Sequence, residues 1–199
     1  MPAAAWFSDL LPGLTTRQLE ALFQHYELLQ RWNQRMNLTS EPPGRELVER
    51  HYCESLFFGE NLPETQAGVS IADIGSGAGF PGFPMAVLRP QWSVTLVESN
   101  QRKSVFLREA SREIPNIRVI SKRAEEVEEH FDWVVSRAVR PEDVGALVPR
   151  LGPNIGLMLV EREFSQIRSS PHIAWDEPVR LPWGEHRLCV YGKSIKRST

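Results

Sequence analysis

A run of alternate glycines contains the residues of this chain best suited to chemistry. Gly75, Gly77 and Gly79 come directly after the apolar segment 69–74, which carries Asp73 near its end. Alternate glycines let a backbone turn tightly and approach a ligand where a side chain would collide. A strand, a glycine turn and a helix start are typical of nucleotide-type pockets at the carboxyl edge of a parallel sheet. The sequence therefore predicts a ligand pocket at this turn.

The residues around the turn discriminate between two classes of nucleotide cofactor. A dinucleotide-binding turn needs a small residue five positions after its first glycine, and the bulky Phe80 occupies that position. An acid such as Asp73 is unfavourable beside a pyrophosphate, but it suits a cofactor with cationic groups. S-Adenosyl-L-methionine carries an ammonium, a sulfonium and a ribose diol, and Glu98 follows the next apolar segment at the usual distance for binding such a diol. We therefore expect S-adenosyl-L-methionine rather than NAD; a plain structural turn with a solvated Glu98 is the alternative.

Strands and helices must alternate to place these residues at one edge of a sheet. From residue 69 onward, apolar segments alternate with helical segments, which is typical of a doubly wound α/β domain. The expected strands are 69–74, 93–98, 117–121, 131–136 and 155–160. The expected helices are 81–88, 99–114 (ended by Pro115) and 141–150, with a short turn at 123–129. Two further strands, 177–183 and 187–193 around Gly184, are expected to close the sheet as an antiparallel pair.

The part of the chain before the first strand carries helical signals. Thr15 and Gln18 form a capping-box pattern, after which apolar residues recur at helical spacing as far as Trp32. A second helix is expected over 45–58, after a loop at 37–44. We therefore divide the chain into an N-terminal helical cap, residues 1–62, and a cofactor-binding domain, residues 63–199.

The composition is that of an ordinary globular protein. The chain has 199 residues, 41% of them hydrophobic and 24% charged, which fits one main domain. Its formal net charge is −2, so a polyanion would have to be met by a local basic face. Cys53 and Cys189 lie far apart, and neither a signal-peptide pattern nor a membrane-length apolar run is present, so we expect a cytoplasmic protein. We also expect a monomer that needs neither metal nor membrane.

Several separated motifs match one known family. They lie at 32–39, 50–56, 73–84, 95–99, 103–108, 123–126 and 136–138. The Phe-Pro-Gly-Phe-Pro run at 80–84, the Asn-Leu-Thr loop at 37–39 and Ser-Arg-Ala at 136–138 are not general methyltransferase features. The chain resembles the bacterial small-subunit (16S) ribosomal RNA guanine-N7 methyltransferases, the glucose-inhibited division protein B family. The resemblance implies a Rossmann-like class I S-adenosyl-L-methionine-dependent methyltransferase fold with an antiparallel final strand, and methylation of N7 of a specific guanine.

The resemblance also implies where the cofactor binds. Contacts are expected from Gly75 and Phe80 in the glycine turn, from Ala124 and Glu125 after the third strand, and from Arg137 after the fourth. The full expected cofactor set is Asp73, Gly75, Gly77, Gly79, Phe80, Glu98, Ala124, Glu125 and Arg137. From the residues alone, Glu125 is better explained as one more charge in the acidic run 125–129. Arg137 at a strand end is expected to bind an anion or to pair with a buried carboxylate such as Asp73.

Methylation of guanine at N7 needs no general base. N7 has an in-plane lone pair, so catalysis reduces to holding it in line with the methyl group and excluding water. The chain has no Pro-Pro-aromatic motif of amino methylation, and neither Cys53 nor Cys189 follows a proline as a cytosine-C5 nucleophile does. We therefore name no certain catalytic residue and regard Arg137 and His51 as positioning candidates. His51 is equally well explained as a helix histidine bonded to a neighbouring group.

The expected partner is small-subunit ribosomal RNA, alone or in a partly assembled 30S subunit. The principal RNA-binding candidates are Arg35, Arg50, Arg102, Lys103, Arg108 and Arg123. Further basic residues that would extend such a face are Arg31, Arg45, Arg112, Lys122, Lys193, Lys196 and Arg197. Each of them alone is best explained as a solvated surface charge, so only clustering in three dimensions would identify a binding face.

One position departs from the family pattern. The fifth strand of the family leads into a Lys-Gly pair, whereas this chain has Glu161 followed by Arg162. The change affects the expected substrate side of the pocket and leaves the cofactor side intact. It is the one hint of a non-catalytic RNA-binding relative; a small-molecule methyltransferase and an NAD-dependent oxidoreductase are the remaining alternatives.

Overall fold

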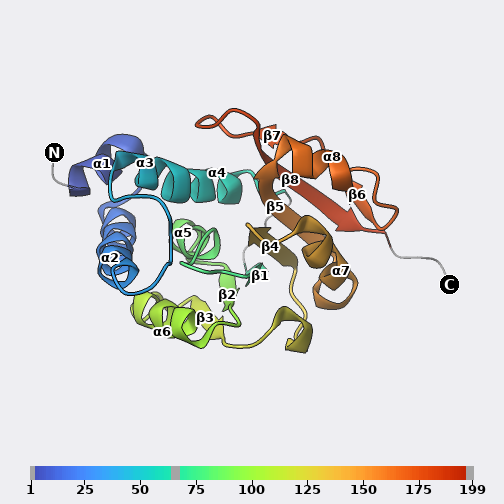
Figure 1. The fold of residues 1–199 in the computed structure, drawn as a ribbon, viewed down its shortest axis with the longest axis horizontal. Helices are drawn as coiled ribbons and strands as arrows, with labels where there is room; N and C mark the ends of the chain where they lie inside the picture. Colours follow the sequence, from blue (N-terminus) through green and yellow to red (C-terminus); the bar gives the residue numbers. More distant parts are fainter. Residues whose placement is uncertain (1–2, 64–67, 196–199) are drawn as a thin grey trace.

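The structure, a computed structural model, describes residues 3–63 and 68–195 and is built around one eight-stranded sheet (Figure 1). The parallel strands are β1 (Ser70–Ile74), β2 (Ser93–Val97), β3 (Ile117–Ile120), β4 (Trp133–Arg137) and β5 (Asn154–Val160). β8 (Arg187–Ser194) runs antiparallel to β5, β6 (Ile173–Trp175) and β7 (Val179–Arg180). The order β3-β2-β1-β4-β5-β8-β6 places β1, and with it the glycine turn, between β2 and β4.

Helices cover both faces of the sheet, as Figure 1 shows. One side carries α1 (Ala3–Leu10), α2 (Thr16–Asn33), α3 (Arg45–Leu47), the π-helical η1 (Val48–Cys53), α4 (Glu54–Glu60), α5 (Gly82–Leu88) and α6 (Gln101–Ala110). The other side carries α7 (Pro141–Leu151) and α8 (Glu161–Ile167), and the short 3₁₀ helix η2 (Ala124–Glu126) follows β3. None of the described helices is long and apolar enough to cross a membrane.

Two clusters of buried apolar side chains fill the spaces between these layers. The first joins Leu29 and Phe58 of the N-terminal helices to Met85 and Phe106 of α5 and α6. The second packs α7 and α8 on the opposite face through residues such as Val144 and Phe164. The N-terminal helices therefore share one core with the sheet, and the division of the chain at residues 62 and 63 stays a prediction.

The strongest local signals of the sequence are confirmed. The Thr15 hydroxyl accepts a hydrogen bond from Gln18 N at 3.3 Å, and the Gln18 side chain accepts one from Thr15 N at 2.9 Å, so the capping box starts α2. The five parallel strands lie within two residues of their expected bounds at either end. The antiparallel closing strand is also present, as β8.

Several boundaries differ for local reasons. α6 ends at Ala110 instead of 114: Ser111 is its C-cap, where the backbone leaves the helical conformation with φ −92° and ψ 5°. The expected strand 177–183 shortens to β7, since the prolines at 178 and 182 have no N–H to contribute to a ladder. α8 was not predicted because it buries only Phe164 and Ile167, too few for a periodic pattern, and α1 and β6 were likewise missed.

The glycine turn has a conformation that other residues rarely adopt. Gly75, Gly77 and Gly79 have φ values of 70°, 57° and 93°, in the left-handed region that costs a side chain energy. The N–H groups of Gly75 and Ser76 donate to the Val97 carbonyl at 2.9 and 3.2 Å, which anchors the turn to the end of β2. The glycines are therefore required by the backbone itself.

A buried histidine ties the N-terminal helices to this turn. Burial lowers the pKa of His25 from 6.5 to about 3, so the ring is neutral and has one N–H. Its Nε2 lies 3.0 Å from the Ala78 carbonyl, which can only accept, so Nε2 carries the proton. Nδ1 then accepts from the Tyr52 hydroxyl at 2.7 Å. α2 and η1 thus hold the turn through a single relay of two hydrogen bonds.

Asp73 supports the same turn from beneath. Its Oδ2 accepts a hydrogen bond from Gly82 N at 3.1 Å, while its Oδ1 has no partner among the described residues. A Cβ at Gly82 would lie 2.7 Å from Oδ2 and 2.5 Å from the Leu96 side chain, so only glycine fits there. Burial raises the pKa of Asp73 from 3.8 to about 7, because the charged carboxylate loses its hydration.

We expect Asp73 to make stability depend on pH in a way that Asp73→Asn removes. A group with a raised pKa in the folded state contributes stability that is fully present below its unfolded pKa and is lost as pH rises through the folded value. The advantage of the wild type over Asp73→Asn should therefore shrink by up to about 4 kcal/mol between about pH 4 and about pH 8. Urea unfolding across this range measures it.

The exposed Asp176 provides the matched control for this experiment. Asp176→Asn should change the free energy of unfolding by nearly the same amount at every pH. If the stability advantage of the wild type over Asp73→Asn stays constant or increases as pH rises, a neutral carboxyl group is not buried at this position.

Candidate functional site

The glycine turn and Glu98 form the centre of the candidate site. Glu98 directly follows β2 and is 8% exposed. Its Oε2 accepts a hydrogen bond from Gly77 N at 2.9 Å, and its Oε1 accepts one from Asn100 N at 2.7 Å. Each carboxylate oxygen keeps further acceptor capacity. The structure thus places an oriented acid directly beside the glycine turn at the carboxyl edge of the sheet.

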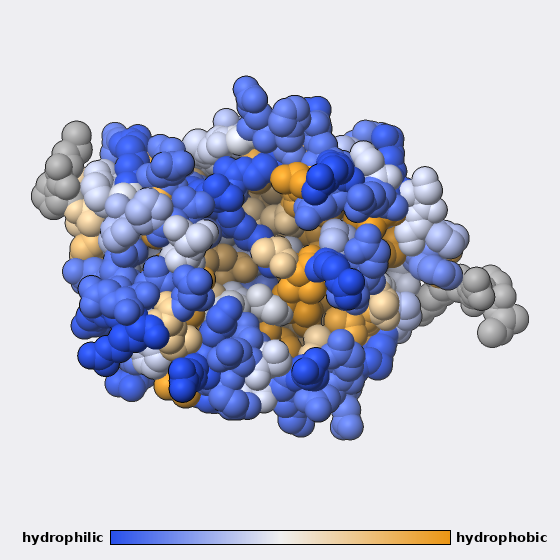
Figure 2. Space-filling model, viewed as in Figure 1, coloured by the Kyte–Doolittle hydropathy of each residue, from blue (hydrophilic) through white to orange (hydrophobic). Residues whose placement is uncertain are grey.

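Figure 2 shows the molecule from this edge, with a hollow over its centre where apolar side chains lie between polar rims. The turn after β3 contributes Ala124, which is half-buried, and Glu125, which is exposed. The Ala124 carbonyl accepts a hydrogen bond from Arg150 at 2.8 Å. Glu125 forms no hydrogen bond or ion pair with another described residue, so its side chain is free to meet a ligand.

Arg137 at the end of β4 is held by a buried carboxylate. Its side chain is 15% exposed, and its Nη2 lies 3.5 Å from Oε2 of Glu54, which is 1% exposed. Its Nη1 donates to the Arg50 carbonyl at 2.9 Å. The acid that pairs with Arg137 is therefore Glu54 and not the expected Asp73, because Asp73 is buried and binds Gly82 N at the start of α5.

Glu54 joins three elements of the fold. Besides Arg137 it binds Arg187 of β8, whose Nη1 donates to Oε2 at 3.0 Å. Burial raises the pKa of Glu54, and the two guanidinium groups oppose that rise. Sequence reasoning missed Glu54, Arg187 and His25 as parts of the site. Nothing in the sequence indicated that Glu54, at the start of α4, would be a buried acid.

His51 lies between the glycine turn and these arginines. Its ring stacks on Phe80 with centroids 4.7 Å apart and planes 17° apart, and its Nε2 lies 2.9 Å from the Thr39 hydroxyl. Its buried Nδ1 has no partner among the described residues. Burial, aided by the nearby positive charge of Arg137, lowers the pKa of His51 to about 3. The ring is therefore neutral at physiological pH and is suited to positioning more than to proton transfer.

The side chain of Phe80 belongs to the core of the protein. It is 6% exposed and packs edge-on against Tyr52, at a centroid distance of 5.0 Å, and edge-on against His25, at 5.4 Å. The bulky ring thus fills the core under the N-terminal helices. This packing accounts for an aromatic residue where a dinucleotide-binding turn has a small one.

The expected RNA-binding residues differ in their surroundings. Arg50 pairs with Glu41 at 2.9 Å, and Arg108 donates to the Ser121 hydroxyl. Lys103 is half-buried and Arg123 is exposed. Arg35, in the turn after α2, and Arg102, in α6, line one groove together with Arg31. Lys196 and Arg197 lie outside the residues that the structure describes.

The departure at Glu161 has a structural explanation. Glu161 begins α8, and its carboxylate pairs with Arg180 of β7 and with Nδ1 of His186, the latter at 2.9 Å. The acid therefore fastens the β7–β8 hairpin to the end of β5. Arg162 beside it is exposed. Glu161 thus has a structural role at this position, in place of the family's Lys-Gly pair.

Solved structures show the same fold. An S-adenosylmethionine-dependent methyltransferase from Aquifex aeolicus matches 85% of this chain and 98% of its own, with a TM-score of 0.60 and 12% identity. A predicted O-methyltransferase from Agrobacterium tumefaciens matches 72% of this chain and 81% of its own, with a TM-score of 0.57 and 20% identity. The chain therefore has the Rossmann-like fold of S-adenosylmethionine-dependent methyltransferases.

Curated relatives are more similar in sequence. Ribosomal RNA small subunit methyltransferase G of Nitrosomonas europaea is 47% identical over 121 residues, which are 59% of this chain and 55% of that protein. The protein of the same name from Chromobacterium violaceum is 39% identical over 135 residues, 66% of this chain and 63% of its own. The matched part of the chain thus spans less than two thirds of the length of these relatives.

A family model described as "GidB: rRNA small subunit methyltransferase G" matches residues 18–163. The match runs from the first turn of α2 to the first turn of α8 and includes the glycine turn, Glu98 and Arg137. Because it covers well over half of the sequence, the chain belongs to the GidB family of rRNA small subunit methyltransferases G.

Proposed function

We propose that this chain transfers a methyl group from S-adenosyl-L-methionine to N7 of a guanine in small-subunit (16S) ribosomal RNA. The observation that carries the proposal is the bond between Gly77 N–H and the Glu98 carboxylate at the carboxyl edge of the sheet. This bond places a carboxylate that can accept hydrogen bonds from a ribose diol next to a glycine turn that a ligand can approach closely. The chain also belongs to a family of methyltransferases. The substrate is naked RNA or RNA in a partly assembled 30S subunit.

The residues at the turn fit this cofactor. A Cβ at Gly77 would meet only the Gly75 carbonyl, at 3.8 Å, so the space above the turn is open. The backbone of Gly75, Gly77 and Gly79 would hold the cofactor, with Glu98 binding its ribose hydroxyls and Ala124 and Glu125 receiving the adenine. When bound, S-adenosyl-L-methionine supplies an electrophilic methyl group. Asp73 supports the turn from below, since its carboxyl group is fully buried.

The chain's own residues then have to position guanine. N7 needs no base, so the low pKa of His51 is no obstacle to the reaction. Arg137 presents planar N–H donors near this edge and is itself oriented by Glu54. Because N7 must stay free to attack, we assign Arg137 to guanine O6, a phosphate or the cofactor carboxylate. Catalysis rests on this alignment and on exclusion of water.

Mapping N7-methylguanine in ribosomal RNA tests the proposed function. RNA from cells that lack this protein should lose one N7-methylguanine from the small subunit, and the purified protein should restore it with labelled S-adenosyl-L-methionine. Offering naked RNA and partly assembled subunits in parallel identifies the substrate. An unchanged methylation pattern, together with no transfer to either substrate, would contradict the proposal.

We expect Glu98→Gln to weaken S-adenosyl-L-methionine binding by about one to two orders of magnitude. The substitution keeps the shape of the side chain but removes a charged acceptor, which costs roughly 1.5–3 kcal/mol. Isothermal titration calorimetry with S-adenosyl-L-methionine and with NAD measures it. Glu113→Gln, at an exposed acid, is the control. Unchanged affinity in Glu98→Gln, or preferential binding of NAD, would refute this placement of the cofactor.

We expect Arg137→Lys to lose most methyl transfer while still folding. A lysine has one point charge and cannot reach both Glu54 and the Arg50 carbonyl with the geometry of a guanidinium fork. Arg187→Lys is the matched control, because it alters the other guanidinium bound to Glu54. Initial rates and thermal melting are measured for both. If both variants lose equal stability and keep equal activity, Arg137 is only one member of a buried ion pair.

A further inference from the structure

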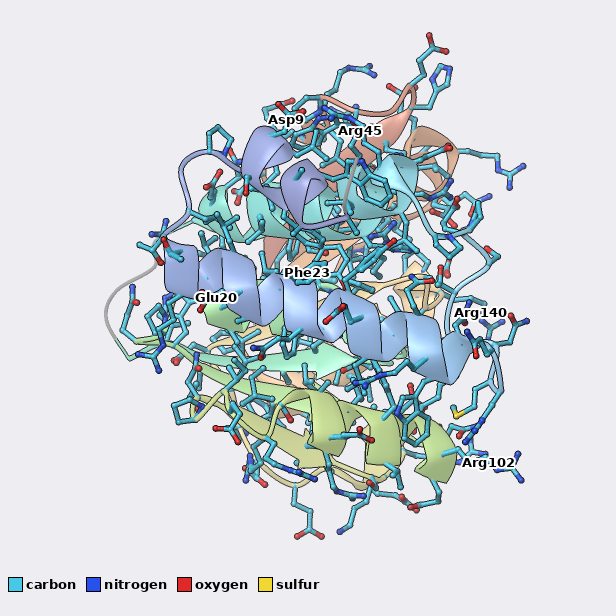
Figure 3. The ribbon with its side chains drawn as sticks, turned by 90° about the vertical axis from the view of Figure 1, so that its left-hand side faces the viewer. Asp9, Glu20, Phe23, Arg45, Arg102 and Arg140 are labelled. Carbon is cyan, nitrogen blue, oxygen red and sulfur yellow. The ribbon has the colours of Figure 1, made fainter. Side chains whose placement is uncertain are left out.

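A groove between α2 and α6 lies outside the cofactor site. Its volume is about 670 Å³, and its lining includes Arg31, Trp32, Arg35, Arg102, Val105 and Glu109. Figure 3 shows Arg102 and Arg140 at the same end of the molecule, and Arg140 comes shortly after the carboxyl end of β4. Asn100, which caps α6, donates its N–H to Glu98. The groove therefore opens beside the proposed cofactor site.

Helical spacing brings the lining residues together. Arg31 lies in the last turn of α2 and Arg35 in the turn that follows the helix, and both line the groove. Arg102, Val105 and Glu109 lie at positions i, i+3 and i+7 of α6 and share a face. Val105 is 49% exposed, an unusual degree of exposure for a large apolar residue in this protein. The two walls combine apolar surface with three cations.

Trp32 is held rigidly in the groove. Its indole Nε1 donates to Oε2 of Glu109 at 3.1 Å, across from α2 to α6. Its ring also packs edge-on against Phe106, with centroids 5.9 Å apart and planes 66° apart. The side chain is half-buried, so part of the ring still faces the groove. A fixed aromatic ring of this kind suits stacking because little entropy is lost when a planar ligand binds.

The guanidinium groups of the three arginines in the groove have no partner among the residues that the structure describes. Arg31, Arg35 and Arg102 are exposed, and none of their guanidinium groups forms a hydrogen bond or an ion pair with another residue of the described ranges. Some other exposed arginines are neutralised by an acid: Arg45 binds Glu49 at 3.1 Å and Arg140 binds Asp143 at 2.9 Å. Glu109 is the one acid among the six residues named, and it is bonded to Trp32. The groove therefore keeps a surplus of positive charge that an anion can neutralise.

We infer that this groove binds nucleotides of single-stranded RNA that flank the modified guanine. An aromatic platform beside unpaired arginines is how proteins hold single-stranded RNA, by base stacking and phosphate contacts. The inference rests on the proposed function, because it gives a path for the RNA that enters the site next to Glu98. It adds a binding site next to the cofactor site but distinct from it, formed by α2, the turn that follows α2, and α6.

The test uses the full chain and a short fluorescein-labelled oligouridylate, followed by fluorescence anisotropy. The double variant Arg35→Ala with Arg102→Ala removes one cation from each wall, and its affinity should fall at least about tenfold. The slope of log affinity against log salt should lessen by about 1.4, or about 0.7 for each phosphate contact on a single strand. Arg17→Ala with Arg112→Ala, two exposed arginines outside the groove, is the control of equal charge and should change little.

A second pair of variants tests the stacking platform. Trp32→Leu should weaken oligouridylate binding by about tenfold, since a stacked base contributes strongly to affinity. Trp32→Phe keeps an aromatic face and should retain most of the binding even though the bond to Glu109 is lost. Calorimetry with S-adenosyl-L-methionine should give the same affinity in every variant. Equal losses in the leucine and phenylalanine variants would contradict stacking.

The outcomes separate the groove from the proposed function. The groove is not the RNA site if its variants bind oligouridylate as tightly as the unaltered chain. The same conclusion follows if the control pair of substitutions weakens oligouridylate binding equally. Either result leaves the proposed methyl transfer unaffected. If poly-glutamate competes as well as RNA, the groove binds an acidic protein and the inference is wrong. If the groove variants lose RNA binding but the unaltered chain transfers no methyl group, the groove is an RNA-binding site and the proposed function is wrong.

Discussion

The conformation of the glycine turn is the constraint on which the rest of the site depends. Three glycines in the left-handed region would be free to adopt many other shapes, so the fold has to hold them from several sides. Glu98 binds Gly77 from β2, His25 binds the Ala78 carbonyl from α2, and Asp73 binds Gly82 from below. The helices, the second strand and the buried acid each contribute one hydrogen bond to the same short segment.

A second buried group, Glu54, fixes the side chain at the end of β4. Glu54 binds Arg137 and Arg187, and so connects α4 with β4 and β8. Burying one carboxylate between two guanidinium groups is expensive unless all are well paired, and removing one partner typically costs 3–5 kcal/mol. The arrangement restricts Arg137 to one orientation at the edge of the sheet. Rigid positioning of a guanidinium is what alignment of guanine would need.

Burial also sets the charge states around the site. His25 and His51 are neutral because burial lowers the pKa of each to about 3, while burial raises the pKa of Asp73 to about 7. Both histidines therefore stay neutral near pH 7, and Asp73, whose pKa does lie near neutrality, is fully buried beneath the glycine turn. That is compatible with methylation of a nitrogen that already has a lone pair, where position and exclusion of water matter more than proton transfer.

The sequence by itself determined the elements with strong local signals. The alternate glycines, the capping box at Thr15 and the apolar strands gave the fold class, the glycine turn and Glu98, because backbone conformation and periodicity are local properties. Only the tertiary structure decided that Arg137 pairs with Glu54 across more than 80 residues of chain, that His25 reaches the glycine turn, and that Arg35 meets Arg102 in one groove. Those contacts depend on how the helices pack across the sheet. The periodicity of apolar residues shows which face of a helix is buried, but it does not show which distant residues that face contacts.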